Sequence, residues 1–153
     1  MMKYIYIFSF LTIGLFACSK QKIEKQAKTD DEAITSYLSK KNLTATKTSS
    51  GIYYIIEKEG STNGAYPKST SQVRVDYKGY FIDDSVFDYS DTMGVIFGLQ
   101  NVIKGWTEGI TYFKEGSEGK LFIPSALAYG PKGSSNIPGN SVLIFDIKLL
   151  DVY

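Results

Sequence analysis

The side chains available for chemistry in this chain are aromatic, hydroxyl and carboxylate groups. The sequence contains no histidine and a single cysteine, Cys18. Ser-His-Asp and Cys-His catalysis, the usual zinc sites and the ordinary neutral-pH proton shuttle are therefore excluded. One cysteine also allows no internal disulfide. A function carried by this chain must use aromatic faces, phenols, carboxylates and backbone groups.

The only tryptophan, Trp106, lies in the stretch VIKGWTEGI, residues 102–110, with a glycine on either side of it. Ile103, Trp106 and Ile110 are spaced i, i+3 and i+7, so one face of a short helix can carry all three. The two glycines let another backbone approach closely, although each costs about 1 kcal/mol of helix propensity. By periodicity alone, Trp106 is a core residue.

The nearly balanced charge argues against a polyanionic partner. The chain has 17 basic and 16 acidic residues, and Arg74 is its only arginine. Nucleic-acid recognition commonly uses clustered basic residues and bidentate guanidinium contacts, so no nucleic-acid partner is expected. The chain has 153 residues, of which 43% are hydrophobic. This is enough to bury the core of one domain and still carry a tail.

The N-terminal segment has the layout of a secretory signal. Lys3 supplies positive charge, and an uncharged run then extends to Ala17, too short for a comfortable membrane span of about 20 residues. The LFAC ending at Cys18 resembles a bacterial lipobox, in which cleavage precedes a cysteine that is then acylated. We expect residues 1–17 to be a lipoprotein signal peptide and Cys18 to carry the lipid. A plain signal-anchor with an incidental cysteine is the alternative.

Residues 18–50 are expected to connect the lipid to a folded domain. The lysine-rich segment 19–29 reads as a solvated tether. Asp30 is a candidate N-cap for a small helix that ends near Lys41. The apolar residues Ile34, Tyr37 and Leu38 have helical spacing and would form the inner face of this helix.

From Gly51 onward the hydrophobic period changes to two, which indicates strands. Four stretches show it: GIYYIIEKEG (51–60), VRVDYKGYF (73–81), GKLFIP (119–124) and SVLIFDIKLLDVY (141–153). Between them, only the segment around Trp106 reads as helix. Strands surrounding one short helix predict an α+β domain over residues 51–153, with an antiparallel sheet whose concave face the helix covers.

Five segments, in order, resemble the FKBP-type peptidyl-prolyl cis-trans isomerases. They are VRVDYKGYFIDDSVFDYS, NVIKGWTEGI, KLFIPSALAYGPKG, NIPGN and LIFDIKLL. The resemblance covers roughly residues 51–153 and implies a twisted sheet of five or six strands around the helix, with a proline-binding cleft between them. It further implies proline-containing polypeptide substrates and tacrolimus-type macrolide inhibitors.

The resemblance also assigns roles to single residues. Three are expected to be catalytic: Trp106 as the floor beneath the proline ring, Tyr129 as a donor to a substrate carbonyl, and Asp88 as a positioning group. Substrate-binding residues are expected at Tyr77, Phe87, Phe97, Val102, Ile103, Ile137 and Phe145. Met93 is an alternative to Phe97 on the aromatic wall, and Asp88 could instead cap a turn.

The chain departs from the family pattern in two loops. Asp83-Asp84 replaces the usual Asp-Gly, which changes the preferred turn geometry. Gly139 replaces a usual proline, which predicts a looser loop over the cleft. The aspartates in this region lack the spacing and the glycine of an EF-hand, and neither a metal site nor a cofactor is expected.

These features predict non-covalent catalysis. Rotation about a prolyl amide faces a barrier of about 20 kcal/mol, largely lost resonance. The twisted amide is less polar than the planar one, so an apolar cleft that excludes water favours it. The predicted function is an exported, membrane-tethered prolyl isomerase on the periplasmic or outer-membrane side of a bacterial membrane, assisting the folding of exported proteins. The alternative is a non-catalytic module that binds proline segments in a secretion or gliding-motility complex.

Overall fold

The computed structural model describes residues 9–153, and for residues 9–18 it describes the backbone alone. The signal-peptide prediction and the Cys18 side chain therefore lie outside what it describes. The elements are α1 (Ser9–Lys41), β1 (Thr46–Lys47), β2 (Tyr53–Lys58), β3 (Gln72–Tyr80), β4 (Val86–Tyr89), β5 (Val95–Gly98), η1 (Leu99–Asn101), α2 (Lys104–Gly109), η2 (Ile110–Tyr112), β6 (Glu118–Ile123), η3 (Ser125–Leu127), η4 (Gly130–Lys132) and β7 (Leu143–Val152), where η marks a 3₁₀ turn.

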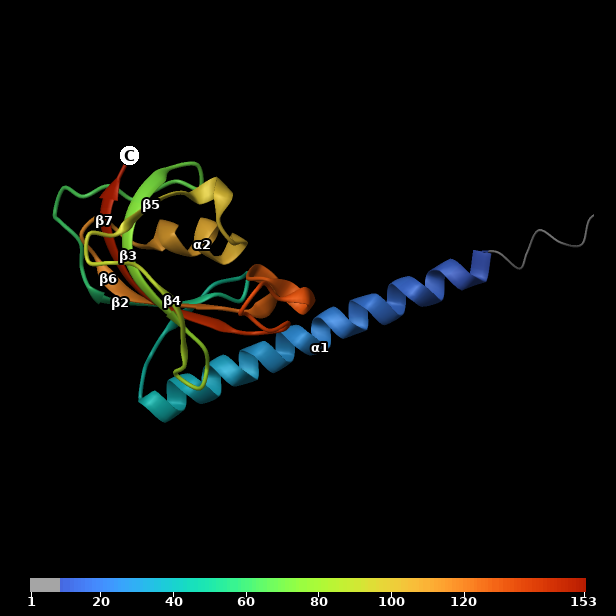
Figure 1. Cartoon of the computed structure of the whole chain (residues 1–153). Coiled ribbons are helices and arrows are strands. Elements are labelled where there is room, and N and C mark those ends of the chain that lie inside the picture. Colours follow the sequence, from blue (N-terminus) through green and yellow to red (C-terminus); the bar gives the residue numbers. More distant parts are fainter. Residues whose placement is uncertain (1–8) are drawn as a thin grey trace, which may run out of the picture.

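Across the described residues, seven strands form one antiparallel sheet in the order β1-β2-β6-β7-β3-β4, with β5 also paired to β3. β5 pairs along the first half of β3 and β4 along the second, so that β3 has two short neighbours on one edge. The sheet curves around α2 (Figure 1). The predicted α+β fold is confirmed. The sheet exceeds the expected five or six strands because of this divided edge and the two-residue β1.

The concave face of the sheet and α2 enclose the main core. In β7, Leu143, Phe145, Ile147 and Leu149 all belong to this core, as their alternation predicts. The glycines of α2 allow the close contact. A Cβ at Gly105 would lie 2.3 Å from Ile123 Cγ2, and one at Gly109 would lie 2.5 Å from Leu121 Cδ1. Only glycine lets α2 lie directly on β6.

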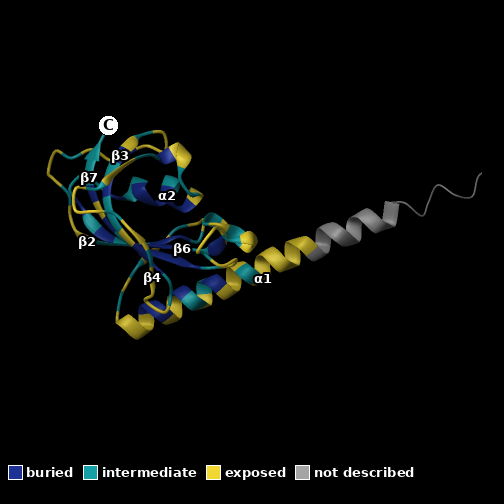
Figure 2. Cartoon of the chain, in the orientation of Figure 1, coloured by how far each residue is buried: buried dark blue, intermediate teal, exposed yellow. Residues whose placement is uncertain are grey.

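The convex face of the sheet is covered by the C-terminal part of α1. Ile34, Tyr37 and Leu38 pack with residues of β2, β3, β6 and β7, and Phe122 is fully buried there. Figure 2 shows this part of α1 as buried where it crosses the sheet and as exposed beyond it. The sheet therefore carries a core on each face.

The predicted start of the N-terminal helix is wrong. α1 begins at Ser9 and runs unbroken through residues 19–29, the expected tether, which is helical and whose side chains are almost all exposed. Asp30 is not an N-cap but lies inside the helix, only 2% exposed. An aspartate inside a helix lowers stability, and here the hydrogen bonds from Ser125, a residue far away in the sequence, offset that loss.

In the part of the chain that the structure describes, no helix is long and apolar enough to cross a membrane.

Polar contacts fix α1 at two further points. Asp31 accepts hydrogen bonds from Lys47 Nζ and from the Tyr53 hydroxyl. Asp84, in the β3–β4 turn, accepts from the Tyr37 hydroxyl and from Lys41 Nζ, each at 2.7 Å. Asp84 has φ +67°, in the left-handed region that glycine adopts most easily. The aspartate in this turn thus gives α1 an anchor that glycine could not provide.

Candidate active site

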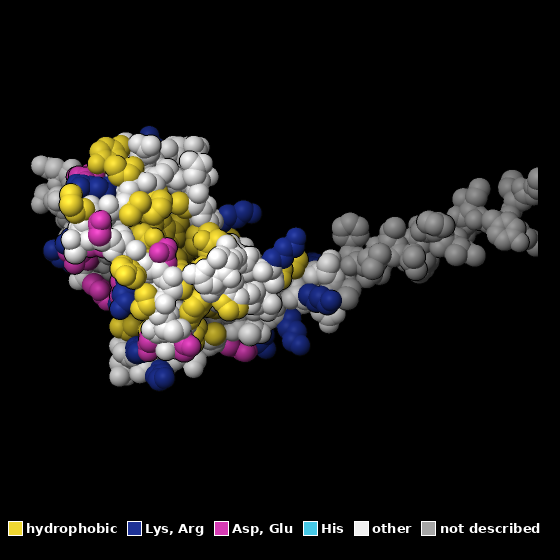
Figure 3. All heavy atoms as spheres, in the orientation of Figure 1, with side chains coloured by type: hydrophobic (Ala, Val, Ile, Leu, Met, Phe, Trp, Pro, Cys, Tyr) yellow, Lys and Arg dark blue, Asp and Glu magenta, His cyan; other side chains and the backbone are white. Residues whose placement is uncertain are grey.

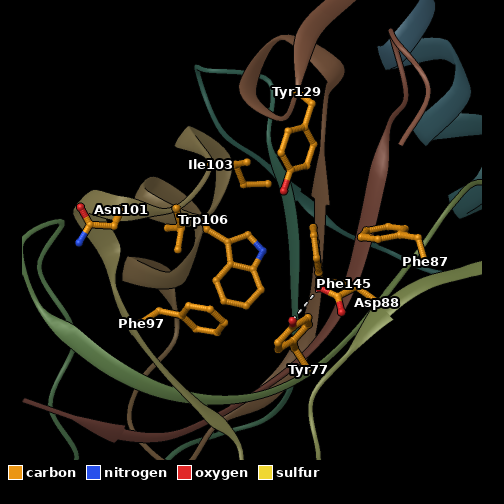
Figure 4. A pocket seen from close by; sticks show the side chains of 10 residues that line it. Tyr77, Phe87, Asp88, Phe97, Asn101, Ile103, Trp106, Tyr129 and Phe145 are labelled. Carbon is orange, nitrogen blue, oxygen red and sulfur yellow. Dashed lines mark hydrogen bonds between the residues drawn. The ribbon is translucent and has the colours of Figure 1, made fainter. Parts of the chain in front are cut away.

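An open pocket of about 430 Å³ lies between α2 and the concave face of the sheet. Hydrophobic side chains gather on the face of the molecule between α2 and β4 (Figure 3). The pocket is lined by Tyr77, Phe87, Asp88, Phe97, Asn101, Val102, Ile103, Trp106, Tyr129 and Phe145 (Figure 4). Most of these groups are aromatic or aliphatic, so the pocket suits an apolar ring with a few polar attachments.

The floor of the pocket is the indole of Trp106, which is only 4% exposed. Three rings meet it edge to face, with centroid separations of 5.2 Å for Tyr77, 5.4 Å for Phe97 and 5.3 Å for Phe145. Each such pair contributes about 0.5–1.5 kcal/mol beyond the area it buries. The indole is thus held rigidly in one orientation by three elements of the sheet.

The indole Nε1 is buried and has no hydrogen-bond partner among residues 9–153. An unpaired buried donor costs about 1–3 kcal/mol. Such groups are few in native structures and often mark functional sites. The pocket floor therefore retains a destabilising feature that packing alone does not explain.

One wall combines a tyrosine with a carboxylate. The Tyr77 hydroxyl donates to Asp88 Oδ2 at 2.8 Å, and Asp88 Oδ1 accepts the backbone N–H of Tyr89 at 3.0 Å. Burial, reinforced by the hydrogen bond to Asp88, raises the pKa of the Tyr77 phenol above its usual value. Tyr77 therefore stays neutral and donates. Asp88 both orients Tyr77 and binds its own backbone, so the positioning and turn-capping interpretations are compatible.

The same wall depends on a glycine in the middle of β3. The rings of Phe87 and Phe145 meet edge to face at 5.7 Å. A Cβ at Gly79 would lie 2.6 Å from Phe87 Cζ and 3.0 Å from Phe145 Cε1. Gly79 thus leaves the room in which these two rings meet, and a larger residue there would push them apart.

Two hydrogen-bond donors at the pocket, one from a side chain and one from the backbone, have no partner among the described residues. Tyr129 is 41% exposed, and Figure 4 shows its hydroxyl directed into the hollow above the floor. No hydrogen bond within the described chain involves that hydroxyl. The Ile103 carbonyl accepts from the N–H groups of Trp106 and Thr107. The N–H of Ile103 itself has no partner in the same part of the chain. Both donors can serve a bound carbonyl.

The structure brings nine of the ten predicted catalytic and substrate-binding residues to one pocket; Ile137 is the tenth. It lies in an adjoining hollow that also includes Phe87, Asp88 and Tyr129. Phe97 lines the pocket, whereas its alternative Met93 is 72% exposed. Asn101 also lines the pocket and was not predicted, because a polar residue just before Val102 carries no distinct sequence signal.

The expected looseness of the loop at Gly139 is not what the structure shows. A Cβ at this position would lie 2.1 Å from the carbonyl oxygen of Pro131. The neighbouring Asn140 N–H donates to Gly130 O at 2.9 Å. The glycine therefore allows close packing of the loop against η4.

Within the described residues, no group of three or more Cys, Asp or Glu side chains is placed to hold a metal ion.

A twisted antiparallel sheet around a short helix, with a ring-lined pocket between them, is the architecture expected from the sequence resemblance. The FKBP-type peptidyl-prolyl cis-trans isomerase family matches residues 64–150, more than half of the chain. The chain belongs to this family.

Among its relatives, the chain is similar to FkpA of Aeromonas hydrophila, with 42% identity over 135 residues, covering 87% of this chain and 48% of the relative. It is similar to FkpA of Escherichia coli K12, with 41% identity over 138 residues, covering 88% of this chain and 50% of the relative. The crystal structure of Escherichia coli FkpA aligns with a TM-score of 0.72 and 36% identity, over 98% of this chain and 74% of that one. The chain thus spans about half the length of the curated relatives it matches.

Proposed function

We propose that this protein catalyses cis-trans isomerisation of X-Pro peptide bonds in polypeptides. The observation that carries the proposal is the open aromatic pocket over Trp106, which no side chain of residues 19–153 fills. A five-membered ring can lie on the indole, and the unused donors of Tyr129 and Ile103 can hold the carbonyls on either side. Membership of the family supports the same activity.

The proposed catalysis needs no covalent or acid-base step. The planar amide is stabilised by resonance, which is lost in the twisted state, and water stabilises its charge separation more than it stabilises the less polar twisted amide. Rings that exclude water remove part of the preference for the planar, polar amide, while fixed donors keep the flanking carbonyls in place. In this scheme Asp88 acts by orienting Tyr77, at 2.8 Å, and does not take a proton from the substrate.

The test is NMR exchange spectroscopy on an Ala-Leu-Pro-Phe type peptide, with and without the full chain. We expect faster cis-trans exchange with protein, and loss of that acceleration when tacrolimus fills the pocket. Peptide binding without any change in exchange rate would reject isomerisation and leave a proline-binding module. Equal exchange rates with no binding would reject the pocket assignment as well.

A pair of substitutions localises the activity. Trp106→Ala removes the floor of the pocket and should abolish the acceleration. Tyr66→Ala is the control, because it removes an aromatic ring that is 59% exposed and does not line the pocket. Truncation of a buried tryptophan costs about 3–5 kcal/mol, so the folded fraction must be measured by circular dichroism. Tacrolimus requires no substitution and therefore separates blockage of the pocket from unfolding.

We further propose that the protein is exported and anchored to a bacterial membrane through an acylated Cys18, where it assists the folding of exported proteins. The support is the sequence layout around Cys18 described above. Two acyl chains would hold the protein stably, because a single chain gives only marginal attachment. Labelling cells with an alkyne-tagged fatty acid should mark the protein and should fail for Cys18→Ser. Equal labelling of both would reject the anchor.

A further inference from the structure

A buried carboxylate of helix α1 binds the loop that carries Tyr129. Asp30 is 2% exposed, and its Oδ2 accepts hydrogen bonds from Ser125 N at 2.8 Å and from Ser125 Oγ at 2.6 Å. Its Oδ1 accepts from Gln26 Nε2 at 2.7 Å. Both carboxylate oxygens are therefore used, and the two bonds of Oδ2 link parts of the chain separated by 95 residues.

Ser125 begins the 3₁₀ turn η3, where a backbone N–H has no partner within the turn. The residue in the N-cap position is Pro124, whose side chain makes no capping hydrogen bond. Asp30 supplies that cap from a distant helix. A charge-assisted cap of this kind is stronger than one between neutral groups, so it fixes the start of the loop.

The position of Tyr129 depends on this start. The N–H of Leu127 donates to Pro124 O and the N–H of Ala128 to Ser125 O, which links the backbone from the cap to the residue before Tyr129. The Tyr129 hydroxyl has no hydrogen bond of its own within residues 9–153. Its placement over the pocket is therefore set by the loop backbone, whose far side is held by the bond from Asn140 N to Gly130 O.

We propose that Asp30 is a positioning residue for the isomerase reaction, holding the Tyr129 loop over the pocket through Ser125. This inference rests on the proposed function. Asp30 touches neither substrate nor the pocket, and it acts only through the loop. It follows that this one contact between α1 and the loop, and not the docking of α1 in general, affects the pocket on the opposite face of the sheet.

The neighbouring residue Asp31 is a matched control. It lies on the same helical turn and also binds α1 to the domain, through Lys47 Nζ and the Tyr53 hydroxyl. These partners belong to β1 and β2, not to the Tyr129 loop. Removing either carboxylate weakens the docking of α1, but only Asp30→Ala removes the cap of η3.

The experiment measures cis-trans exchange by the full chain carrying Asp30→Ala or Asp31→Ala, each with and without Tyr129→Phe. We expect Asp30→Ala to lower kcat/KM about two- to tenfold, the size of one lost hydrogen bond, because the Tyr129 hydroxyl would no longer be held in place. In the Tyr129→Phe background the same substitution should change kcat/KM by less than about twofold, because the group it positions is gone. Asp31→Ala should have less than about a twofold effect in both backgrounds.

Equal losses from Asp30→Ala in both backgrounds would show a general loss of structure and overturn the inference, as would no loss in either. If Asp30→Ala fails to fold, Ser125→Ala replaces it. That variant keeps the backbone N–H and loses only the 2.6 Å hydroxyl bond. Its smaller loss of kcat/KM should show the same dependence on Tyr129, and independence from Tyr129 would overturn the inference.

A readout without turnover separates this inference from the proposed function. Amide NMR signals of residues 125–130 should shift and broaden in Asp30→Ala and stay in place in Asp31→Ala. If the wild-type chain does not accelerate exchange but these signals respond as expected, the isomerase proposal fails while the coupling between Asp30 and the loop is retained. Unchanged signals in both variants would overturn the coupling itself.

Discussion

Two tyrosines in the pocket differ in what holds their hydroxyl groups. The Tyr77 hydroxyl is engaged at 2.8 Å by Asp88, and its phenol is kept neutral by burial and by that bond, which raise its pKa. The Tyr129 hydroxyl has no partner within the described residues and lies at the pocket mouth. Tyr77 thus forms part of a rigid wall, whereas Tyr129 keeps its hydroxyl available to donate to a substrate.

Tyr129→Phe tests this difference between the two tyrosines, because it removes only the hydroxyl group. No hydrogen bond among the described residues is lost, so the free energy of unfolding should change by less than about 0.5 kcal/mol. A lost bond to the substrate should lower kcat/KM about two- to tenfold. Exchange spectroscopy and urea unfolding measure the two quantities. Unchanged kcat/KM would mean that the phenol is not a donor.

Tyr77→Phe is the comparison for that experiment. It removes the 2.8 Å bond to Asp88 from the folded chain, so it should lower the free energy of unfolding by about 0.5–1.5 kcal/mol. A variant pair in which Tyr129→Phe is the more destabilising of the two would contradict the hydrogen-bond assignment. Equal stability of both variants and the wild type would contradict it as well.

The ring residues of the pocket could be predicted because their types recur in motifs with fixed order. Ile137 could be assigned to the region but not to its hollow, because its place depends on the path of the loop around Gly139, which packs on Pro131. The polar Asn101 left no signal at all. What the sequence lacks is the set of contacts between loops, since these are formed by residues far apart in the chain.

Helix α2 is short and rich in glycine because it packs against β6 without intervening side chains. Gly105 faces Ile123 and Gly109 faces Leu121, each at a separation that leaves no room for a methyl group. The cost of glycine in a helix is about 1 kcal/mol per residue, and close packing of the indole-bearing helix offsets it. The position of Trp106 relative to the sheet thus follows from these glycines.

Gly109→Ala should therefore destabilise the protein although alanine is the better helix former. The new Cβ would lie 2.5 Å from Leu121 Cδ1, and overpacking of this kind costs about 1–3 kcal/mol. Combined with Leu121→Ala, the added methyl group should partly fill the space left by leucine, so the double variant should lose less than the sum of the two. Urea unfolding of the four chains measures this coupling. Additive losses would mean that the two residues do not clash.

Helix α1 shows why a helix start can be misplaced. Aspartate favours N-caps, so Asp30 after a polar segment is an ordinary prediction for a helix start. Residues 19–29 nevertheless contain no glycine or proline and consist largely of good helix formers. The interior position of Asp30 is then stabilised by Ser125, a tertiary contact that no local pattern encodes.

The docking of α1 should respond to alkaline pH through Tyr37. Burial, followed by the hydrogen bond to the Asp84 carboxylate, raises the pKa of Tyr37 from 10.0 to about 12. A raised phenol pKa means that its contribution to stability is fully present below pH 10 and is lost as the pH rises through 12. The stability advantage of wild type over Tyr37→Phe should shrink across this window in urea unfolding. A constant advantage would contradict the buried, hydrogen-bonded phenol, and subtraction of the variant removes the effect of the other tyrosines.

Across the whole molecule, one sheet supports two cores. β6 and β7 send alternate residues to opposite faces, with Leu121 facing α2 and Phe122 facing α1. The period of two along these strands could be read from the sequence, and so could the inner face of the helix at Ile34, Tyr37 and Leu38. The face of the sheet on which that helix packs could not, because no local pattern encodes it. The second core links α1 to the same strands that form the pocket wall.

Only part of α1 is stabilised by this second core. From residue 30 onward its inner face is buried against the sheet, whereas residues 19–29 are exposed apart from the half-buried Gln26. The ion pairs Lys20–Glu24 and Lys28–Glu32, at 3.9 and 3.7 Å, lie on the surface and contribute about 0.5 kcal/mol each at most. Isolated helical segments of this length are marginal in water, so the first part of the helix depends on the docked part.

Hydrogen exchange of the full chain should therefore divide α1 in two. Amides of residues 20–29 should open by local fraying and exchange at least about tenfold faster than those of residues 33–41, whose opening requires loss of the second core. The buried amide of Ile34 is the internal reference, since its side chain is fully buried. Asp84→Ala removes the anchor to Tyr37 and Lys41 and should speed exchange in residues 33–41 while leaving residues 20–29 unchanged. Equal protection of residues 20–29 and 33–41 would contradict this division, because it would require a partner that covers the exposed residues 19–29.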